Sequence, residues 1–363
     1  MLKRLITVIA LLAITVMSLA QEAKDVKFSY TEASTLTMVG KMFPDTPKPY
    51  ERLDYEKHKG FNEKDISLVK MSSGLAVSFK TDSPIITVRG RMESFRAAGD
   101  PHAHRGFDLY IKKDGKWLWA GCSTLSEDLS KTGGGTLVQY MDGTMKECLM
   151  YFPTYACVTS VKIGIKEGCR IEAGEQPFRH RVAIFGSSFT HGMGATRSGL
   201  TYPAIFTRKT GIQLLSMGVS GDCRMQPQFA NAFKDADVEA FIFDSFSNGS
   251  AKTVEQSLFK FIETIQAAHP GKPLIFQRTI WRERRNFNSK VETDEKTKAD
   301  MAEKLMAEAL KKYKDVYFIT PCATSKDHET TEDGTHPGDY GYYLWAESIV
   351  KPVTKILAKY GIK

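Results

Sequence analysis

Two patterns of hydrophobic positions divide this chain. Between residues 25 and 177, short runs rich in Val, Ile, Tyr and Phe recur between turn signals, without helical periodicity. From residue 178 onward, similar short runs alternate with longer segments whose apolar residues are three and four positions apart. The first pattern predicts a β-sandwich of the jelly-roll kind, and the second predicts a parallel sheet with helices on both faces. We therefore predict two domains, 25–177 and 178–363.

The predicted strands of the first region are 68–71, 75–79, 85–89, 107–111, 116–120, 137–140, 147–152 and 160–165. Glycine-containing stretches at 113–115, 133–135 and 141–143 are predicted hairpin turns or loops. The segment 174–177, which contains Gly and Pro, is the predicted linker between the domains.

The second region is predicted to alternate strands with helices. The strands are 181–186, 212–216, 240–244, 273–277 and 316–319, and the helices are 201–210, 254–268, 299–313 and 340–360. Right-handed crossovers would bring the carboxyl ends of all these strands to one edge of the sheet. Ligands bind at that edge in open α/β sheets, so we expect the functional residues there.

The first twenty residues are typical of a secretory signal peptide. Lys3 and Arg4 precede an apolar run, and the small residues Ser18 and Ala20 precede the predicted cleavage site after Ala20. The mature protein is therefore expected to be secreted or periplasmic. A retained membrane anchor is less favoured, because the run is short and no Cys follows the cleavage site to accept a lipid.

The composition argues against several classes of partner. The chain has 363 residues with 42% hydrophobic and 25% charged residues, as in globular proteins. Removing the two positive charges of the leader lowers the net charge from +8 to +6. The remaining basic residues are spread along the chain and form no dense patch in the sequence. Nucleic acid is therefore not an expected partner. The sequence makes no prediction of oligomeric state.

The cysteine and histidine spacings do not favour a metal or another cofactor. The six cysteines lack paired metal-ligand spacing, and an oxidising compartment would permit one or two disulfides among Cys122, Cys148, Cys157 and Cys169. His102 and His104 have a spacing that could hold a metal, but a loop near the domain interface is the favoured interpretation.

Three residues could form a nucleophile-activating relay. Asp333 and His336 lie three apart on a turn marked by Gly and Pro, and Ser188 lies in a Gly/Ser turn after a predicted strand. A carboxylate that accepts one imidazole N–H leaves the other ring nitrogen free to take a proton from a hydroxyl. Gly221 and Asn248, which follow the next two strands, could donate hydrogen bonds to an oxyanion.

These blocks, in this order, resemble the SGNH (GDSL-type) hydrolase family. The matching residues are Gly186-Ser187-Ser188-Phe189-Thr190, Gly221, Asn248 and Asp333-Gly334-Thr335-His336, and Gly106-Phe107-Asp108-Leu109-Tyr110 resembles the GxDLY signature of an N-terminal domain fused to such esterases. The resemblance implies a flavodoxin-like three-layer α/β/α domain. It also implies that Ser188 is the nucleophile, His336 the general base and Asp333 its orienting carboxylate, with an oxyanion hole of the Ser188 and Gly221 N–H groups and the Asn248 amide.

One residue departs from the family pattern, and each role has a structural alternative. Ser187 replaces the usual Asp before the nucleophile, which we expect to tune the turn without abolishing activity. Ser188 could be a cap or turn former, and Gly221 a turn glycine. His336, and Asp333 with it, could belong to an ordinary turn, and Asn248 could cap the following helix or form an Asx turn. For Trp281 and Arg282, which follow the fourth strand, a solvated loop is favoured over stacking on a sugar and pairing with an acidic group.

The favoured function is a secreted serine esterase that hydrolyses short acyl esters, with O-acetyl groups on carbohydrates as the expected substrates. The alternatives are a lipase or lysophospholipase of the same fold, and a non-catalytic carbohydrate-binding protein. The charged loop after the fourth strand argues against long acyl chains. A β-sandwich that completes the catalytic cleft by packing on the sheet is preferred to one that binds sugar independently.

Overall fold

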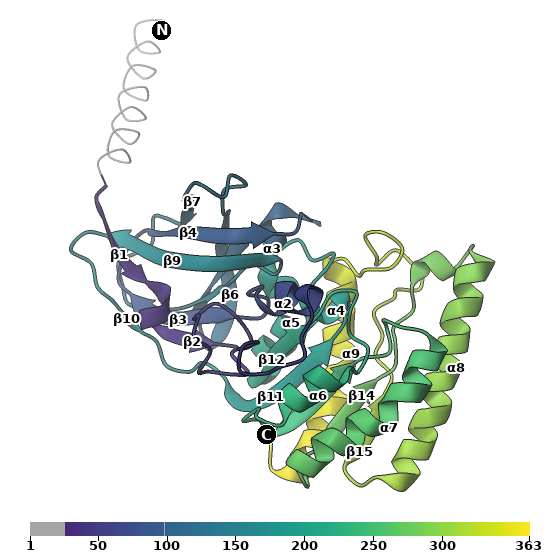
Figure 1. Ribbon diagram of the computed structural model, residues 1–363. Coiled ribbons are helices and arrows are strands. Elements are labelled where there is room, and N and C mark those ends of the chain that lie inside the picture. Colours follow the sequence, from purple (N-terminus) through teal and green to yellow (C-terminus); the bar gives the residue numbers. More distant parts are fainter. Residues whose placement is uncertain (1–25, 98) are drawn as a thin grey trace, which may run out of the picture.

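The computed structural model describes residues 26–97 and 99–363, so the predicted signal peptide lies outside the described residues (Figure 1). Two antiparallel sheets from the N-terminal half lie beside one parallel sheet from the C-terminal half. Within the described ranges, no helix combines the length and apolar character needed to cross a bilayer.

The N-terminal half is a β-sandwich, as predicted. Its elements are β1 (Phe28–Glu32), η1 (Ala33–Thr35), β2 (Thr37–Val39), α2 (Glu63–Val69), β3 (Ala76–Thr81), β4 (Ile86–Phe95), α3 (Pro101–His104), β5 (Gly106–Lys113), β6 (Lys116–Thr124), β7 (Gly133–Val138), β8 (Lys146–Tyr151), β9 (Ala156–Lys166) and β10 (Ile171–Ala173). One sheet has the order β1-β9-β4-β7, and the other has the order β10-β3-β8-β5-β6 with β2 beside β3. Inward-facing residues such as Phe79, Val88 and Ile163 form the core between them.

Two predictions in this half were wrong. Residues 68–71, predicted as a strand, lie at the end of helix α2, which begins with a capping box in which Asn62 and Asp65 each accept the other's backbone N–H. Residues 133–135, predicted as a loop, begin strand β7, where Gly134 pairs with Arg89. A Cβ at Gly134 would lie 2.1 Å from the Val88 carbonyl oxygen, so glycine permits this close pairing.

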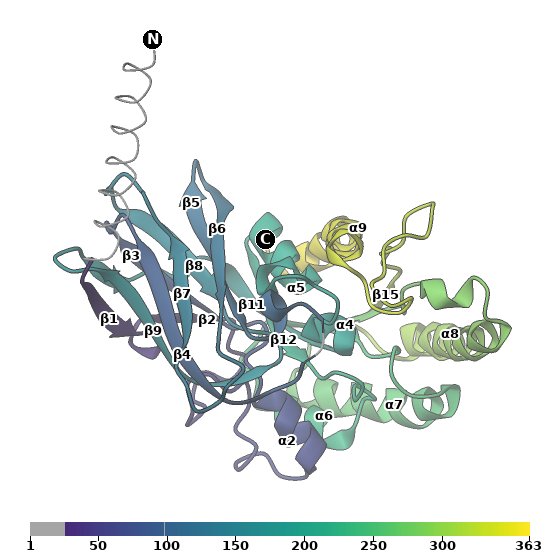
Figure 2. The same ribbon diagram turned by 90° about the horizontal axis from the view of Figure 1, so that it is seen from above.

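The C-terminal half confirms the predicted three-layer fold. Its elements are β11 (Arg179–Gly186), α4 (Ser188–His191), η2 (Ser198–Leu200), α5 (Tyr202–Thr210), β12 (Ile212–Gly218), α6 (Pro227–Phe233), β13 (Ala240–Asp244), α7 (Ala251–Ala268), β14 (Leu274–Gln277), η3 (Glu283–Arg285), α8 (Ser289–Lys312), β15 (Val316–Ile319), α9 (Asp339–Leu357) and η4 (Ala358–Tyr360). The parallel sheet has the order β12-β11-β13-β14-β15. Helices α5 and α9 cover one face, and α6, α7 and α8 cover the other (Figure 2).

The two halves share a hydrophobic core along the β12 edge of the parallel sheet. Leu68, Met71 and Tyr155 from the N-terminal half are buried in the same cluster as Phe185 and Met217 from the first two parallel strands. The predicted boundary near residue 177 falls between β10 and β11, and it stays a prediction. All six cysteines lie in the described ranges and none is in a disulfide.

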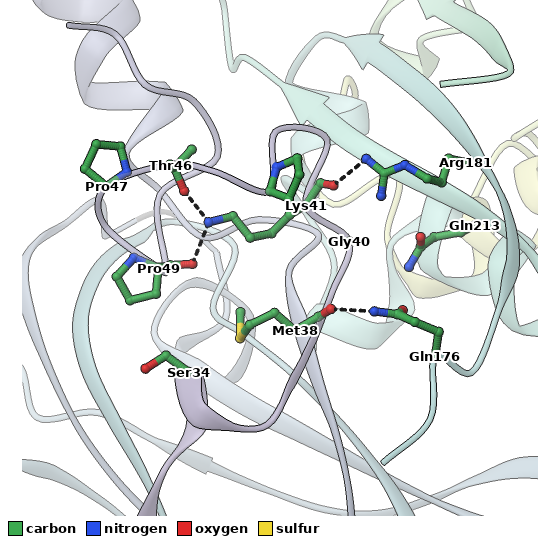
Figure 3. Close-up of a pocket in the computed structure, with 11 residues that line it drawn as sticks. Ser34, Met38, Gly40, Lys41, Thr46, Pro47, Pro49, Gln176, Arg181 and Gln213 are labelled. Atoms are coloured by element: carbon green, nitrogen blue, oxygen red, sulfur yellow. Dashed lines mark hydrogen bonds between the residues drawn. The ribbon is translucent and has the colours of Figure 1, made fainter. Parts of the chain in front are cut away.

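A cavity of about 290 Å³ lies between the halves at the amino ends of β11 and β12 (Figure 3). Lys41 lines it, and burial lowers the pKa of its ammonium to about 8 against the raising effects of Asp45 and Glu51. The buried amide nitrogen of Gln213 has no hydrogen-bond partner among the described residues. This cavity is at the opposite end of these strands from Ser188, which follows the carboxyl end of β11.

Candidate active site

A sharp strand-to-helix turn presents Ser188. Strand β11 ends at Gly186, Ser187 caps helix α4 by accepting the Phe189 N–H, and Ser188 is the first helical residue. A Cβ at Gly186 would lie 1.9 Å from the Thr190 hydroxyl oxygen, so glycine is needed for the helix to fold back on the strand. The turn leaves Ser188 6% exposed, at the edge where the carboxyl ends of the parallel strands meet.

The structure brings together the three residues of the predicted relay. The Ser188 hydroxyl oxygen lies 2.9 Å from Nε2 of His336, and Nδ1 of His336 lies 2.8 Å from Oδ2 of Asp333. Because Asp333 can hold the proton on Nδ1, Nε2 is the nitrogen left to accept a proton from the hydroxyl. This is the geometry that nucleophilic activation of a serine requires.

Local hydrogen bonds fix the Asp333 carboxylate in its turn. Its Oδ1 accepts the backbone N–H groups of Thr335 and His336 at 2.9 and 2.8 Å. Burial alone would raise the pKa of Asp333, but these bonds and the His336 side chain outweigh it and hold that pKa below its usual value. Asp333 therefore remains an acceptor for the imidazole at neutral pH.

Glu283, which the sequence analysis did not single out, anchors the loop that carries Asp333 and His336. Its Oε1 accepts the backbone N–H and hydroxyl of Thr330, both at 2.8 Å, and its Oε2 accepts the corresponding groups of Thr331 at 3.0 and 2.6 Å. The next residue along η3, Arg284, donates its backbone N–H to the Gly334 carbonyl oxygen at 2.7 Å. The loop after β14 thus holds the relay loop in place.

The three predicted oxyanion donors are free to bind a ligand. Within residues 26–97 and 99–363, the backbone N–H groups of Ser188 and Gly221 have no hydrogen-bond acceptor. The Asn248 amide oxygen accepts the Cys223 N–H at 3.1 Å, which directs the amide nitrogen away from that backbone and leaves its two N–H groups available. The capping alternative for Asn248 was wrong, because the next helix is capped by Ser250.

A second carboxylate missed by the sequence analysis, that of Asp244, lies beneath the turn. Asp244 ends β13 and is 1% exposed, and its Oδ2 accepts both the hydroxyl and the backbone N–H of Ser187, at 2.8 and 3.2 Å. Burial raises its pKa, against hydrogen bonds from Ser187, Ser247 and Thr190. The sequence shows that Asp244 ends an apolar run, but it does not show that β13 pairs with β11, and this pairing is what places the carboxylate beneath the turn.

Trp281 and Arg282 lie in different surroundings. Trp281 is 36% exposed, its indole N–H donates to Asn286, and the Arg285 guanidinium lies 4.0 Å from its ring centroid. Arg282 instead pairs with Glu295 at 2.8 Å and donates to the Ser247 carbonyl oxygen at 2.7 Å. The Arg282 guanidinium therefore supports the loop just before Asn248. Substrate binding by Trp281 or Arg282 stays a prediction.

His102 and His104 belong to the short helix α3. His102 pairs with Asp100 at 2.9 Å, and His104 is buried with its ring stacked on Phe95. Among the residues that the structure describes, no group of three or more His, Cys, Asp or Glu side chains is arranged to hold a metal ion.

Comparison with known proteins gives two family matches. Residues 179–355 match the GDSL-like lipase/acylhydrolase family, and residues 27–171 match GxDLY, the N-terminus of SGNH-hydrolase-type esterases. A candidate GDSL-like lipase from Bacteroides ovatus has a similar crystal structure, with 33% sequence identity and a TM-score of 0.87 over 92% of this chain and 98% of that one. A search of curated proteins finds no significant match.

More distant structures share the fold. The salicylyl-acyltransferase SsfX3 of a tetracycline biosynthetic pathway is 19% identical, with a TM-score of 0.67 over 91% of this chain and 97% of its own. A family two carbohydrate esterase from Clostridium thermocellum, solved with cellohexaose, is 13% identical, with a TM-score of 0.57 over 78% of this chain and 92% of its own. At these low identities, the likeness shows a shared fold and nothing further.

Proposed function

Because this chain belongs to the GDSL-like lipase/acylhydrolase family of SGNH hydrolases, we propose that it is a serine esterase that removes short acyl groups, chiefly acetyl, from carbohydrates. The observation that carries the proposal is the relay of two contacts, Ser188 to His336 at 2.9 Å and His336 to Asp333 at 2.8 Å. The free N–H groups of Ser188, Gly221 and Asn248 lie on the loops that follow the adjacent strands β11, β12 and β13.

In the proposed mechanism, the Ser188 oxygen forms a bond to the ester carbonyl carbon while Nε2 of His336 takes the hydroxyl proton. The carbonyl oxygen becomes an anion held by the Ser188 and Gly221 N–H groups and the Asn248 amide. Collapse of this intermediate breaks the bond to the alcohol, which takes the proton from His336. Water then attacks the acyl-enzyme with the same base, releasing the acid and restoring Ser188.

Two observations support a short acyl group on a saccharide. The loop after β14 carries four consecutive charged residues, Arg282, Glu283, Arg284 and Arg285, and so supplies no run of apolar side chains there for a long acyl chain. Trp281 on that loop is 36% exposed, with Arg285 over one face of its ring, and the other face is the proposed stacking surface for a sugar. The fold shared with a carbohydrate esterase and the leader-like N-terminus fit a secreted or periplasmic enzyme acting on extracellular saccharides.

The test is hydrolysis of 4-nitrophenyl acetate, butyrate and octanoate by the native protein, Ser188→Ala and the control Ser289→Ala. We expect acetate to be the preferred ester, and Ser188→Ala to lower kcat by at least about a thousandfold. Ser289 lies on the exposed start of α8, so its variant should retain full activity. Release of acetate from an acetylated xylo-oligosaccharide should show the same dependence on Ser188.

The other outcomes distinguish the alternatives. Turnover that rises with acyl length would replace the short-chain proposal with a lipase or lysophospholipase. Equal activity of the native protein and Ser188→Ala would remove Ser188 as the nucleophile. Saccharide binding without Ser188-dependent hydrolysis of any ester would support a non-catalytic carbohydrate-binding protein.

A further inference from the structure

One buried cation joins the N-terminal half to the proposed oxyanion loop. The Arg52 side chain is 1% exposed, and all its acceptors are backbone carbonyl oxygens. On the N-terminal side, Nη2 donates to Leu68 at 2.5 Å and Nε donates to Met71 at 2.7 Å. On the catalytic side, Nη1 donates to Gly218 at 2.9 Å and lies 3.5 Å from Ser216. Arg52 therefore ties the end of α2 to the carboxyl end of β12.

The charge of Arg52 is not neutralised by an acid. In the described part of the chain, no carboxylate lies within ion-pair distance of its guanidinium. Burial lowers the pKa of Arg52 to about 10, which still leaves it protonated at neutral pH. A buried charge without a counter-ion is costly, and here backbone carbonyl oxygens compensate for it in place of a carboxylate.

This charge acts on the last residue of the short helix that begins at the proposed nucleophile. Burial and then the Arg52 charge lower the pKa of His191, the last residue of the short helix α4 that begins at Ser188. His191 is therefore neutral, with Nε2 bonded to the Thr154 carbonyl oxygen at 2.7 Å. A Cβ at Gly218 would lie 2.3 Å from the backbone nitrogen of His191, so the strand end held by Arg52 packs directly on this helix.

The same strand end leads to the Gly221 peptide, which the N-terminal half also contacts from α2. Gly221 lies three residues after Gly218 and has a φ of +70°, which suits a glycine turn. Lys64 of α2 approaches the Gly221 carbonyl oxygen at 3.3 Å and pairs with Asp222 at 3.0 Å. Arg224, from the catalytic half, donates to the same carbonyl oxygen at 3.1 Å, so the loop that carries the Gly221 N–H is held by contacts from both halves of the chain.

We propose that Arg52 is a positioning residue for the esterase reaction, fixing the end of β12 so that the Gly221 N–H meets the oxyanion and placing an unpaired positive charge that favours this anion. The inference rests on the proposed function. A fixed charge stabilises the anionic tetrahedral intermediate more than the neutral ester. Loss of Arg52 should therefore lower kcat and leave KM nearly unchanged.

Arg181 offers a matched control at the other end of the sheet. It also bridges the two halves through backbone carbonyls, donating to Lys41 at 3.2 Å (Figure 3). The same guanidinium donates to the Met42 carbonyl oxygen at 3.1 Å. It lies near the amino end of β11, beside the cavity and away from Ser188. Arg181→Met thus removes bonds between the halves without disturbing the end of β12.

The experiment compares the native protein with Arg52→Met, Arg52→Lys and Arg181→Met, using 4-nitrophenyl acetate and a fluorophosphonate that counts reactive serines. Per reactive serine, we expect Arg52→Met to lower kcat by roughly tenfold to a hundredfold, with KM within about twofold. Arg52→Lys keeps the charge and fewer donors, so it should recover part of the loss. Arg181→Met should keep the native kcat even if its melting temperature falls.

A transition-state analogue gives a second readout. The serine oxygen adds to the carbonyl carbon of a trifluoromethyl ketone while His336 takes the proton, and the hemiketal formed carries an oxyanion. The inhibition constant should therefore rise in Arg52→Met by about the factor by which kcat/KM falls. Native kcat and native inhibition in Arg52→Met would overturn the inference. If Arg52→Met does not fold, Arg52→Lys takes its place in the test. A reduced kcat in Arg52→Lys would then support the inference, and a native kcat would overturn it.

This failure is distinct from failure of the proposed function. An unaffected Arg52→Met in an active, Ser188-dependent esterase removes only the role of Arg52. Absence of esterase activity in the native protein, or activity that survives in Ser188→Ala, removes the proposed function and the inference resting on it.

Discussion

At the scale of single residues, the candidate site relies on side chains fixed by several hydrogen bonds each. Ser188, His336 and Asp333 could be predicted from the sequence because each lies in a short block with its own turn signals. Asp244 and Glu283 could not, because their partners Ser187 and Thr330 are distant in the chain and meet them only after folding. With Ser187 in place of the family's usual Asp, the carboxylate of Asp244 reaches the turn from the adjacent strand.

Replacing Glu283 by Gln should loosen the loop that carries Asp333 and His336. Each carboxylate oxygen of Glu283 accepts the backbone N–H and the hydroxyl of one threonine, Thr330 or Thr331. In the Gln variant, one of these oxygens becomes an NH2 group, which cannot accept these hydrogen bonds. We expect the free energy of unfolding at pH 7 to fall by roughly 1–3 kcal/mol, measured by urea denaturation, and kcat to fall with it.

The pH dependence of this effect follows from the pKa of Glu283. Burial would raise that pKa, but the hydrogen bonds from Thr331 and Thr330 lower it below 4.5. A carboxyl group with a lowered folded-state pKa stabilises the fold above its unfolded pKa and loses this contribution as the pH falls through the folded value. The native protein and Glu283→Gln should therefore converge in stability as the pH falls through the lowered folded-state pKa of Glu283. A difference that is constant with pH, or equally large for the exposed control Glu255→Gln, would contradict this.

At the scale of elements, local signals decided most assignments, and of the two wrong ones only that of β7 depends on tertiary pairing. Strands β13 and β15 match their predicted bounds, because their apolar runs end at polar residues, Asp244 in β13 and Thr320 after β15. The end of helix α2 was misassigned because the short, mostly apolar run at 68–71 suits a strand when it is taken alone. The capping box that begins six residues earlier, at Asn62, is the signal that a helix starts there. Strand β7 was misassigned because three consecutive glycines are typical of a loop, and only the close approach of β4 explains them.

Gly134 should tolerate alanine much less well than Gly115. Both have positive φ, at +114° and +76°, so a side chain costs roughly 1–2 kcal/mol at each. A Cβ at Gly134 would also meet the Val88 carbonyl oxygen at 2.1 Å, whereas at Gly115 nothing lies within 4 Å. Gly134→Ala should therefore lose about 2 kcal/mol more unfolding free energy than Gly115→Ala, as measured by chemical denaturation. Equal losses would mean that β7 and β4 are not paired closely at this position.

At the scale of the whole molecule, the two halves form one folded unit around the β12 edge. Leu68 and Tyr155 are buried with Phe185 and Met217, and Arg52 and Ser73 bond to backbone oxygens of β12 and α4. This arrangement favours the hypothesis that the β-sandwich supports the catalytic cleft, which the sequence analysis preferred to independent sugar binding.

Expressing residues 178–363 alone should give a protein that is poorly soluble and inactive on 4-nitrophenyl acetate. Removal of the N-terminal half would expose the β12 edge of the core and leave the Gly221 loop without Arg52 and Lys64. Solubility, circular dichroism and kcat per reactive serine are the measurements. A soluble fragment with the activity of the full chain would show that the β-sandwich is not needed for the cleft.

The sequence by itself determined the two classes of fold, most strands and helices, and the blocks that carry Ser188, His336, Asp333, Gly221 and Asn248. It could do so because hydrophobic periodicity and turn chemistry act over a few residues. Only the tertiary structure decided which carboxylate lies beneath the nucleophile turn, what anchors the relay loop, and how Arg52 joins the halves. Those contacts join residues between 47 and 166 positions apart, and a linear pattern holds no record of such pairings.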